Sequence, residues 1–238
     1  MILAAHQPNY LPWLGYFHKM TNCDIFVFLD DVQFARRSFT HRTRIKFIDG
    51  RAGWLTVPVK KKGRYFQKIN EVKINNEEDW QTRHLKTLEH CYKKAPYFHD
   101  YDDLLELIYK DSWENLSKMN LEIVKKIAHY LKISPQFLLA SEMNVEGKGT
   151  DLIISLCQKC QANVYLSGRG GERYLEKEKF DAAGIQLLFS KFSSPRYPQL
   201  WGNFVPNFSI VDLLFNVGEK SAEILRDKLG VFSKDASR

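Results

Sequence analysis

The sequence predicts an α/β fold, a mostly parallel sheet with flanking helices and a central helical insertion over residues 79–133. Two observations carry this prediction. Apolar runs of strand length alternate with helix-like segments, first over residues 1–29 and again over residues 137–189. From residue 101 to 133, apolar residues instead recur at helical spacing. Alternating strands and helices are typical of a parallel sheet.

The first 75 residues are expected to form an N-terminal α/β part. Strands are predicted at residues 1–5 and 23–29, and a short helix at residues 14–20 joins them. If these strands are parallel, His6 and the pair Asp30 and Asp31 emerge at the same sheet edge. In open α/β sheets, ligands usually bind at that edge.

Residues 54–59 and 66–74 are predicted to be further strands on either side of a basic turn. Pro58 favours an edge strand or a strand end, because proline cannot donate to a ladder. The turn carries Lys60, Lys61 and Lys62. This run is either a solvated turn or a contact for a phosphate group or a carrier protein.

A helical part is expected over residues 76–135, and a second α/β part of the same domain over residues 136–228. In this part, strands are predicted at residues 137–140, 162–166 and 184–189, and helices at residues 151–160 and 172–180. Ser209 is placed to cap the last helix, with Asp212 in the first turn, where it would complement the helix dipole. Residues 229–238 read as a polar tail.

Composition and charge restrict the class of protein. Of 238 residues, 44% are hydrophobic and 26% are charged, which is typical of a globular chain. The net charge of +7 favours an anionic partner, but no basic helix or arginine-rich arm indicates nucleic acid. No apolar stretch approaches the roughly 20 residues that span a bilayer, and no signal peptide is evident. We therefore expect a cytoplasmic protein without a transmembrane segment.

The four cysteines are expected to be reduced, and no metal site is predicted. Cys157 and Cys160 form a CxxC pair, but no second pair or histidine stands at zinc-finger spacing. Packing in an apolar helix is the favoured interpretation. Cys23 could accept an acyl group, but its place before an apolar strand favours burial.

The candidate catalytic residues follow the two predicted N-terminal strands. His6 is the candidate general base, because its ordinary pKa suits neutral pH, and Asp30 or Asp31 would orient it or accept from an amine. Asn9, Gln7 or backbone amides at Gly170 and Gly171 would stabilise an oxyanion. The alternative for this aromatic-rich loop is a core loop without chemistry.

Substrate contacts are predicted from aromatic, basic and glycine-rich segments. Arginines bind diphosphate bidentately, although the arginine segment at residues 36–44 is equally well explained as a solvent-facing stretch. The turn at residues 167–171 follows a strand, as anion-binding loops do, but it matches neither a Walker loop nor a dinucleotide fingerprint. The predicted substrate-binding residues are Gln7, Tyr10, Trp13, Arg42, Arg44, Gly168, Arg169, Gly170, Gly171 and Tyr197.

Six sequence blocks in order give the chain a close resemblance to the WbqC-like family. The blocks are HQPNYLPWLGYF at 6–17, LDDVQF at 29–34, RTRIK at 42–46, LTVPV at 55–59, YLSG at 165–168 and SIVDLLFN at 209–216. The resemblance runs from about residue 2 to 218. It implies bacterial origin and a setting in gene clusters for surface polysaccharides, including the O-antigen of lipopolysaccharide. His41 departs from the asparagine expected there.

The family resemblance implies modification of a nucleotide-linked amino sugar. The first hypothesis is a transferase that N-acylates or aminoacylates the sugar amine, with His6 as general base. The acyl donor would be a thioester, and an acyl carrier protein is a candidate partner for Lys60, Lys61 and Lys62. No other cofactor is expected.

Two alternatives remain open at this stage. The first 35 residues are similar to the start of pantothenate-synthetase-like nucleotidyltransferases. Nucleotidyl or adenylyl transfer would use His6 and His18 on the phosphates, with Mg²⁺ at Asp30 or Asp31. The other alternative is a non-enzymatic protein that binds nucleotide sugars or other anions.

Overall fold

The computed structural model describes residues 1–226 and 231–233. Its main sheet has six strands in the order β5-β2-β1-β6-β7-β8, of which the first five are parallel and the last is antiparallel. The strands are β1 Ile2–His6, β2 Ile25–Phe28, β5 Gln136–Leu139, β6 Val164–Ser167, β7 Gln186–Ser190 and β8 Val231–Ser233. The predicted α/β fold with a mostly parallel sheet is therefore confirmed.

Strand β1 is central and buries both faces. Ala4 belongs to one apolar cluster, whereas Leu3 and Ala5 belong to the other, as the two-residue period of a strand requires. His6 at the end of β1 is paired in register with Phe28. The apolar run that predicted this strand reflects burial on both faces.

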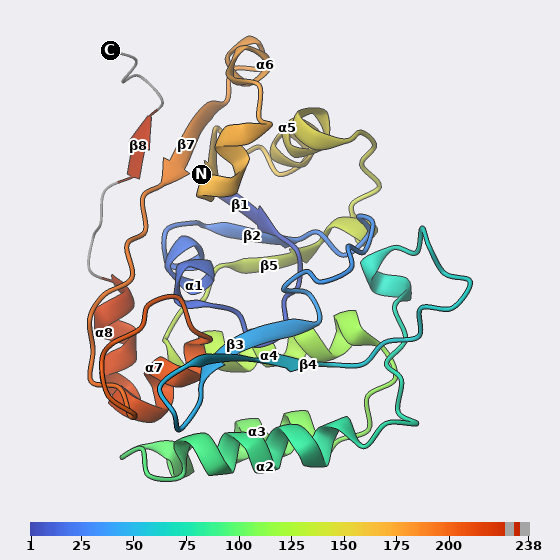
Figure 1. Cartoon of the computed structure of the whole chain (residues 1–238). Coiled ribbons are helices and arrows are strands. Elements are labelled where there is room, and N and C mark those ends of the chain that lie inside the picture. The colour runs from blue at the N-terminus through green and yellow to red at the C-terminus, as the bar shows by residue number, and fades with distance from the viewer. Residues whose placement is uncertain (227–230, 234–238) are drawn as a thin grey trace.

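Helices cover both faces of the sheet (Figure 1). The helices are α1 Leu14–Thr21, α2 Trp80–Tyr92, α3 Asp102–Tyr109, α4 Leu116–Tyr130, α5 Gly149–Lys159, α6 Lys177–Ala182, α7 Ile210–Val217 and α8 Ser221–Arg226. Helices α5 and α6 pack on the face of Leu3 and Ala5, and α1, α4 and α7 pack on the face of Ala4. None of the described helices is long and apolar enough to cross a membrane.

A second, two-stranded sheet lies between the main sheet and helices α2 and α3 (Figure 1). It pairs β3 Arg42–Lys46 with β4 Ala52–Thr56 in antiparallel register. Pro58 follows the end of β4, in agreement with the expectation for a proline. The sequence did not indicate β3, because two of its three buried side chains, Thr43 and Lys46, are polar, so burial in this strand leaves no apolar alternation.

The strand predicted over residues 66–74 is wrong. The segment instead holds a 3₁₀ turn at Ile69–Glu71 and isolated bridges, one of them joining Gln33 to Lys68. The Glu71 carboxylate accepts from the Lys68 backbone N–H at 2.8 Å, so local bonds replace a ladder. The helix predicted over residues 172–180 is likewise split, into a 3₁₀ turn at Arg169–Arg173 and the short α6.

Helix α7 begins at the predicted Ser209 cap, but Asp212 in its first turn has a different role from the predicted one. The Ser209 hydroxyl accepts from the Val211 N–H at 3.4 Å and so caps the helix. Asp212 is buried and accepts from the Tyr92 hydroxyl, the Tyr197 hydroxyl and the Gln199 amide at 2.8, 2.7 and 2.8 Å. Its carboxylate therefore ties α7 to α2 and to the loop before α7, beyond any effect on the dipole. Most of the predicted tail at 229–238 lies outside the described residues, although 231–233 form β8.

Candidate active site

Chain connections from β1 and β6 run in opposite directions along the sheet. From β1 the chain passes through α1 to β2 on one side, and from β6 it passes through α6 to β7 on the other. The crevice between β1 and β6 is therefore the topological switch point, where open α/β sheets usually bind ligands. Only the strand order reveals this position, because the two strands are more than 150 residues apart.

A cavity of about 370 Å³ opens at this switch point. It brings together five residues that the sequence predicted for the site: His6, Trp13, Gly168, Arg169 and Gly170. The remaining lining residues were not predicted, and they are Gly15, Tyr16, Lys19, Ser190, Phe192 and Asn207. Residues 15 and 19 share one face of α1, so helical spacing from the loop could have indicated Lys19.

The His6 imidazole is oriented by neighbouring rings and one carbonyl. Nδ1 lies 3.2 Å from the Gln7 carbonyl oxygen, which can only accept, so the neutral ring carries its proton on Nδ1. The ring packs edge-on against Tyr16 and Trp13, with centroids 4.8 and 5.5 Å away. Burial, and then the nearby Lys19 ammonium, lower the pKa of His6 to about 3. At neutral pH the imidazole is neutral, and Nε2 is its acceptor atom. The lowered pKa makes it a weaker base than the ordinary histidine on which the sequence prediction rested.

Lys19 reaches the same end of β1 from helix α1. Its Nζ donates to the Ala5 carbonyl at 2.8 Å and lies 5.8 Å from the centre of the Phe26 ring. Only 4% of the residue is exposed. Burial lowers the pKa of this ammonium to about 8, so it stays mainly protonated at neutral pH.

Gly15 keeps the aromatic side of the cavity open. A Cβ atom there would lie 2.9 Å from both Phe192 Cδ1 and Trp13 Nε1. The opposite side is the turn after β6, where Gly171 is packed so closely that a Cβ would lie 2.1 Å from Ser167 Oγ. A Cβ at Gly168 or Gly170 would meet nothing within 4 Å, which leaves backbone next to the cavity.

The two predicted carboxylates lie at the same sheet edge but not in the His6 cavity. Asp30 accepts from the Ser141 N–H and hydroxyl at 3.0 and 2.7 Å. Asp31 lines a second cavity, of about 680 Å³, together with Lys68 and Lys148. In the described part of the chain, neither a hydrogen bond nor an ion pair joins either carboxylate to His6, so the structure does not bring this predicted base and acid pair together.

Three predicted residues of the opening loop, Gln7, Asn9 and Tyr10, lie outside the cavity lining, and the last two are buried. Tyr10 is fully buried, and its hydroxyl contacts the Tyr109 hydroxyl at 2.7 Å and His84 Nδ1 at 3.0 Å. Asn9 is also buried, and the Gln7 amide oxygen accepts from Thr40 at 3.4 Å. The Tyr10 and Gln7 side chains hold the opening loop against neighbouring elements, and none of the three lines the cavity.

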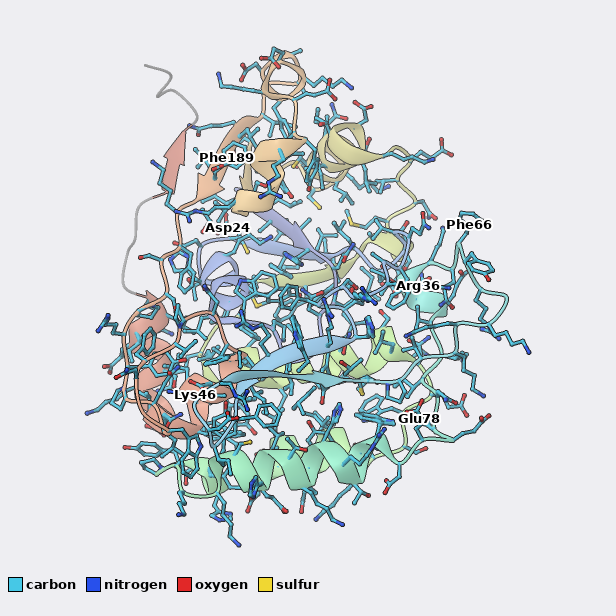
Figure 2. All side chains as sticks on the ribbon, viewed as in Figure 1. Asp24, Arg36, Lys46, Phe66, Glu78 and Phe189 are labelled. Atoms are coloured by element: carbon cyan, nitrogen blue, oxygen red, sulfur yellow. The ribbon has the colours of Figure 1, made fainter. Side chains whose placement is uncertain are left out.

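Arg42, Arg44 and Tyr197, which the sequence also predicted, lie outside the cavity lining. The Arg42 guanidinium stacks 4.0 Å from the Trp54 ring centre, and Arg44 lies 5.7 Å from that of Phe208. Tyr197 is bound to Asp212 in the buried network before α7. These side chains belong to the surroundings of β3 and α7. Figure 2 marks this region with Lys46, whose ammonium donates to the Asn203 carbonyl at 2.6 Å.

Among the described residues, the structure shows no metal-binding cluster and no thiol activated as a nucleophile. No group of three or more His, Cys, Asp or Glu side chains there is arranged to hold a metal ion. All four cysteines are free thiols. Burial raises the pKa values of Cys23 and Cys157 to about 12, so both stay protonated and weakly nucleophilic at neutral pH.

Comparison with known proteins agrees with the resemblance seen in the sequence. The model of the WbqC-like protein family matches residues 7–224, nearly the whole chain. The chain is also similar to the uncharacterized protein Rv1507c of Mycobacterium tuberculosis, with 38% identity over 226 residues, which cover 94% of this chain and 97% of the relative. No solved structure matches the chain.

Proposed function

The chain belongs to the WbqC-like protein family, and on that premise we propose that it is a transferase of bacterial surface-polysaccharide biosynthesis. Its reaction is N-acylation of the amine of a nucleotide-linked amino sugar in the cytoplasm. The observation that supports this proposal best is the neutral His6 imidazole in a cavity with Trp13 and Arg169. Such a cavity offers a proton acceptor, an aromatic wall for a base or sugar, and a cation for phosphate.

Acyl transfer to an amine requires a proton acceptor close to the attacking nitrogen. The neutral sugar amine attacks the carbonyl carbon of a thioester, the C–N bond forms, and the C–S bond breaks. The amine proton passes to His6 Nε2 and then to the departing thiolate, so that no net charge remains on the protein. The Nδ1 bond to Gln7 holds the ring in the tautomer that this step needs.

The lysine run at residues 60–62 is the proposed docking contact for an acyl carrier protein. It is exposed and lies in the segment that also exposes Tyr65 and Phe66. Arg36 stacks 5.4 Å from the Tyr65 ring centre, and Figure 2 labels Arg36 and Phe66 at the same edge of the molecule. An acidic carrier surface would complement this edge.

An assay with defined donor and acceptor tests the proposal. The protein is incubated with a nucleotide-linked amino sugar and an acyl thioester, and the sugar is analysed by mass spectrometry for the added acyl group. His6→Ala is expected to lower the rate by roughly 10²- to 10⁴-fold, the usual contribution of a general base. His90→Ala, at an exposed position on α2, is the matched control.

Two results would contradict the proposal. Full activity of His6→Ala would remove His6 from the reaction. Pyrophosphate release from ATP with no acyl donor present would instead support nucleotidyl transfer. That alternative is favoured by one observation, which is that the cavity carries the cations Lys19 and Arg169, both suited to phosphate groups.

A further inference from the structure

The Lys19 ammonium is a buried cation with no counter-ion among the residues that the structure describes. Among the described residues it has one hydrogen-bond acceptor, the Ala5 carbonyl, and one ring contact, to Phe26. No Asp or Glu in the described part of the chain forms an ion pair with it. A lone ammonium removed from water is costly unless a negative partner compensates it. The free protein therefore holds a positive charge whose natural partner is an anion from outside.

The cavity that Lys19 lines is suited to such an anion. Its described lining contains a second cation, Arg169, with the Ser190 hydroxyl and the Asn207 amide as neutral donors, and no acidic side chain. Arg169 is exposed and forms no ion pair with the described residues. One cation is thus fixed and buried, while the other reaches the cavity from its solvent side.

Arg42 and Arg44, which the sequence also predicted to bind a diphosphate, contact aromatic rings outside the cavity. Arg42 has its guanidinium face against Trp54, and Arg44 lies near Phe208. Neither residue lines the cavity of His6. Both residues are half-buried and keep part of their surface in solvent, so they remain a competing site that an experiment has to separate from Lys19.

We propose that the cavity between the carboxyl ends of β1 and β6 binds the diphosphate of the nucleotide-linked substrate, with the Lys19 ammonium as its fixed anchor. Arg169 closes over the diphosphate from the solvent side. This inference rests on the proposed function for the identity of the substrate, whereas the positive charge of the described cavity lining favours an anionic ligand in any case.

Anion binding at Lys19 also changes the proposed base. Repulsion from the Lys19 ammonium is one of the two causes that lower the pKa of His6, and burial is the larger one. A diphosphate beside Lys19 cancels that repulsion and adds negative charge near the ring. Substrate binding is therefore coupled to a rise in the pKa of His6, which makes the imidazole a stronger base when the substrate is present.

The test measures binding without any acyl donor. Inorganic pyrophosphate and uridine diphosphate are titrated into the protein at pH 7 by isothermal calorimetry. Lys19→Met is expected to weaken both affinities roughly tenfold or more, as for loss of a charge-assisted hydrogen bond. Lys86→Met, which removes an exposed lysine on α2, is the control for net charge and is expected to bind like the wild type.

Further variants keep the inference testable if Lys19→Met does not fold. Arg169→Gln, at an exposed position, is also expected to weaken both ligands. In the wild type, the His6 ring signals followed by NMR are expected to titrate at higher pH when pyrophosphate is present. Unchanged binding by Lys19→Met, an unchanged His6 titration, or loss of binding in Arg42→Gln alone would overturn the inference.

The outcomes separate this inference from the proposed function. Binding that depends on Lys19, without acyl transfer in the assay above, would leave the anion site standing and reject acylation. Acyl transfer that depends on His6, with normal ligand binding by Lys19→Met, would do the reverse.

Discussion

At the scale of single residues, the cavity holds two titratable side chains whose pKa values are both lowered by the protein. His6 is neutral and Lys19 is charged, and burial is the first cause of both lowered pKa values. The buried charge of Lys19 has a cost in free energy, and perturbed pKa values of this kind cluster at functional sites. A residue kept at a cost to stability is expected to show that cost when it is replaced.

The first prediction concerns the effect of Lys19 on stability. Its folded pKa of about 8 lies below the ordinary value of 10.5, so between these values the unfolded chain binds more protons. The Lys19 contribution to the free energy of unfolding therefore rises with pH in that window, by at most about 3 kcal/mol. We expect the difference between wild type and Lys19→Met to shift in favour of the wild type from pH 8 to 10.

Urea denaturation at several pH values measures this difference, with Lys86→Met as the control. The titratable and charged groups that interact with Lys19 are His6 on β1 and Cys23 after α1, with Arg169 across the cavity. Burial raises the pKa of Cys23, which acts on stability in the opposite direction above pH 9. Cys23→Ala in both backgrounds removes that contribution. A difference that is constant across pH would contradict the assignment of a buried cation.

At the scale of elements, the turn after β6 decides how close backbone comes to the cavity. Gly171 donates to the Gly168 carbonyl at 3.0 Å within a 3₁₀ turn, where the sequence had predicted only a glycine-rich anion loop. Ser167 and Leu175 occupy the space into which a Cβ at this position would project. Of the adjacent glycines, position 171 therefore has a packing requirement and position 170 has none.

The second prediction is a contrast between these neighbouring glycines. A Cβ at residue 171 would lie 2.1 Å from Ser167 Oγ and 2.8 Å from Leu175 Cδ1, so the turn must shift. Gly171→Ala is expected to lower the free energy of unfolding by about 1–3 kcal/mol, as overpacking does. Gly170→Ala, where a Cβ meets nothing within 4 Å, is expected to be neutral within about 0.5 kcal/mol. Urea midpoints measure both, and equal effects would refute the contrast.

At the scale of the whole molecule, buried neutral histidines tie distant parts of the fold together. Burial lowers the pKa of His41 and of His84 to about 4, and it also lowers that of His18. His84 bonds the opening loop through Tyr10, and the His41 ring packs edge-on against Phe34. Protonation of these rings has to disrupt contacts between elements.

The third prediction is therefore acid sensitivity. Between a lowered folded pKa and the unfolded value of 6.5, the unfolded chain binds more protons, so stability falls as pH drops from 6.5 towards 4. His84→Gln is expected to reduce this loss by about 2 kcal/mol, because one such group is removed. Chemical denaturation at pH 7, 5.5 and 4.5 provides the measurement, with exposed His90→Gln as control. Identical pH slopes in both variants would show that His84 does not contribute.

How much was predictable follows from the range of each interaction. Strand–helix–strand order, the Ser209 cap and the position of His6 at a strand end depend on neighbours in the chain, and local patterns indicated them. Strand β3 and the burial of Tyr10 depend on partners outside their own segments, β4 and His84, and the bridge from Gln33 to Lys68 joins the segment of the 3₁₀ turn at Ile69–Glu71 to another part of the chain. No periodicity within those segments encodes such partners.

The sequence by itself determined the fold class, the family and the end of the sheet at which His6 lies, because apolar periodicity and motif order are properties of the chain. The tertiary structure alone decided which predicted residues share a cavity. It joined His6 and Trp13 to Arg169 across the switch point, added Lys19, and left Asp30, Arg42 and Tyr197 with other partners. The physical reason is that strand order and burial are set by packing between segments far apart in the chain, and these determine both neighbours and charge.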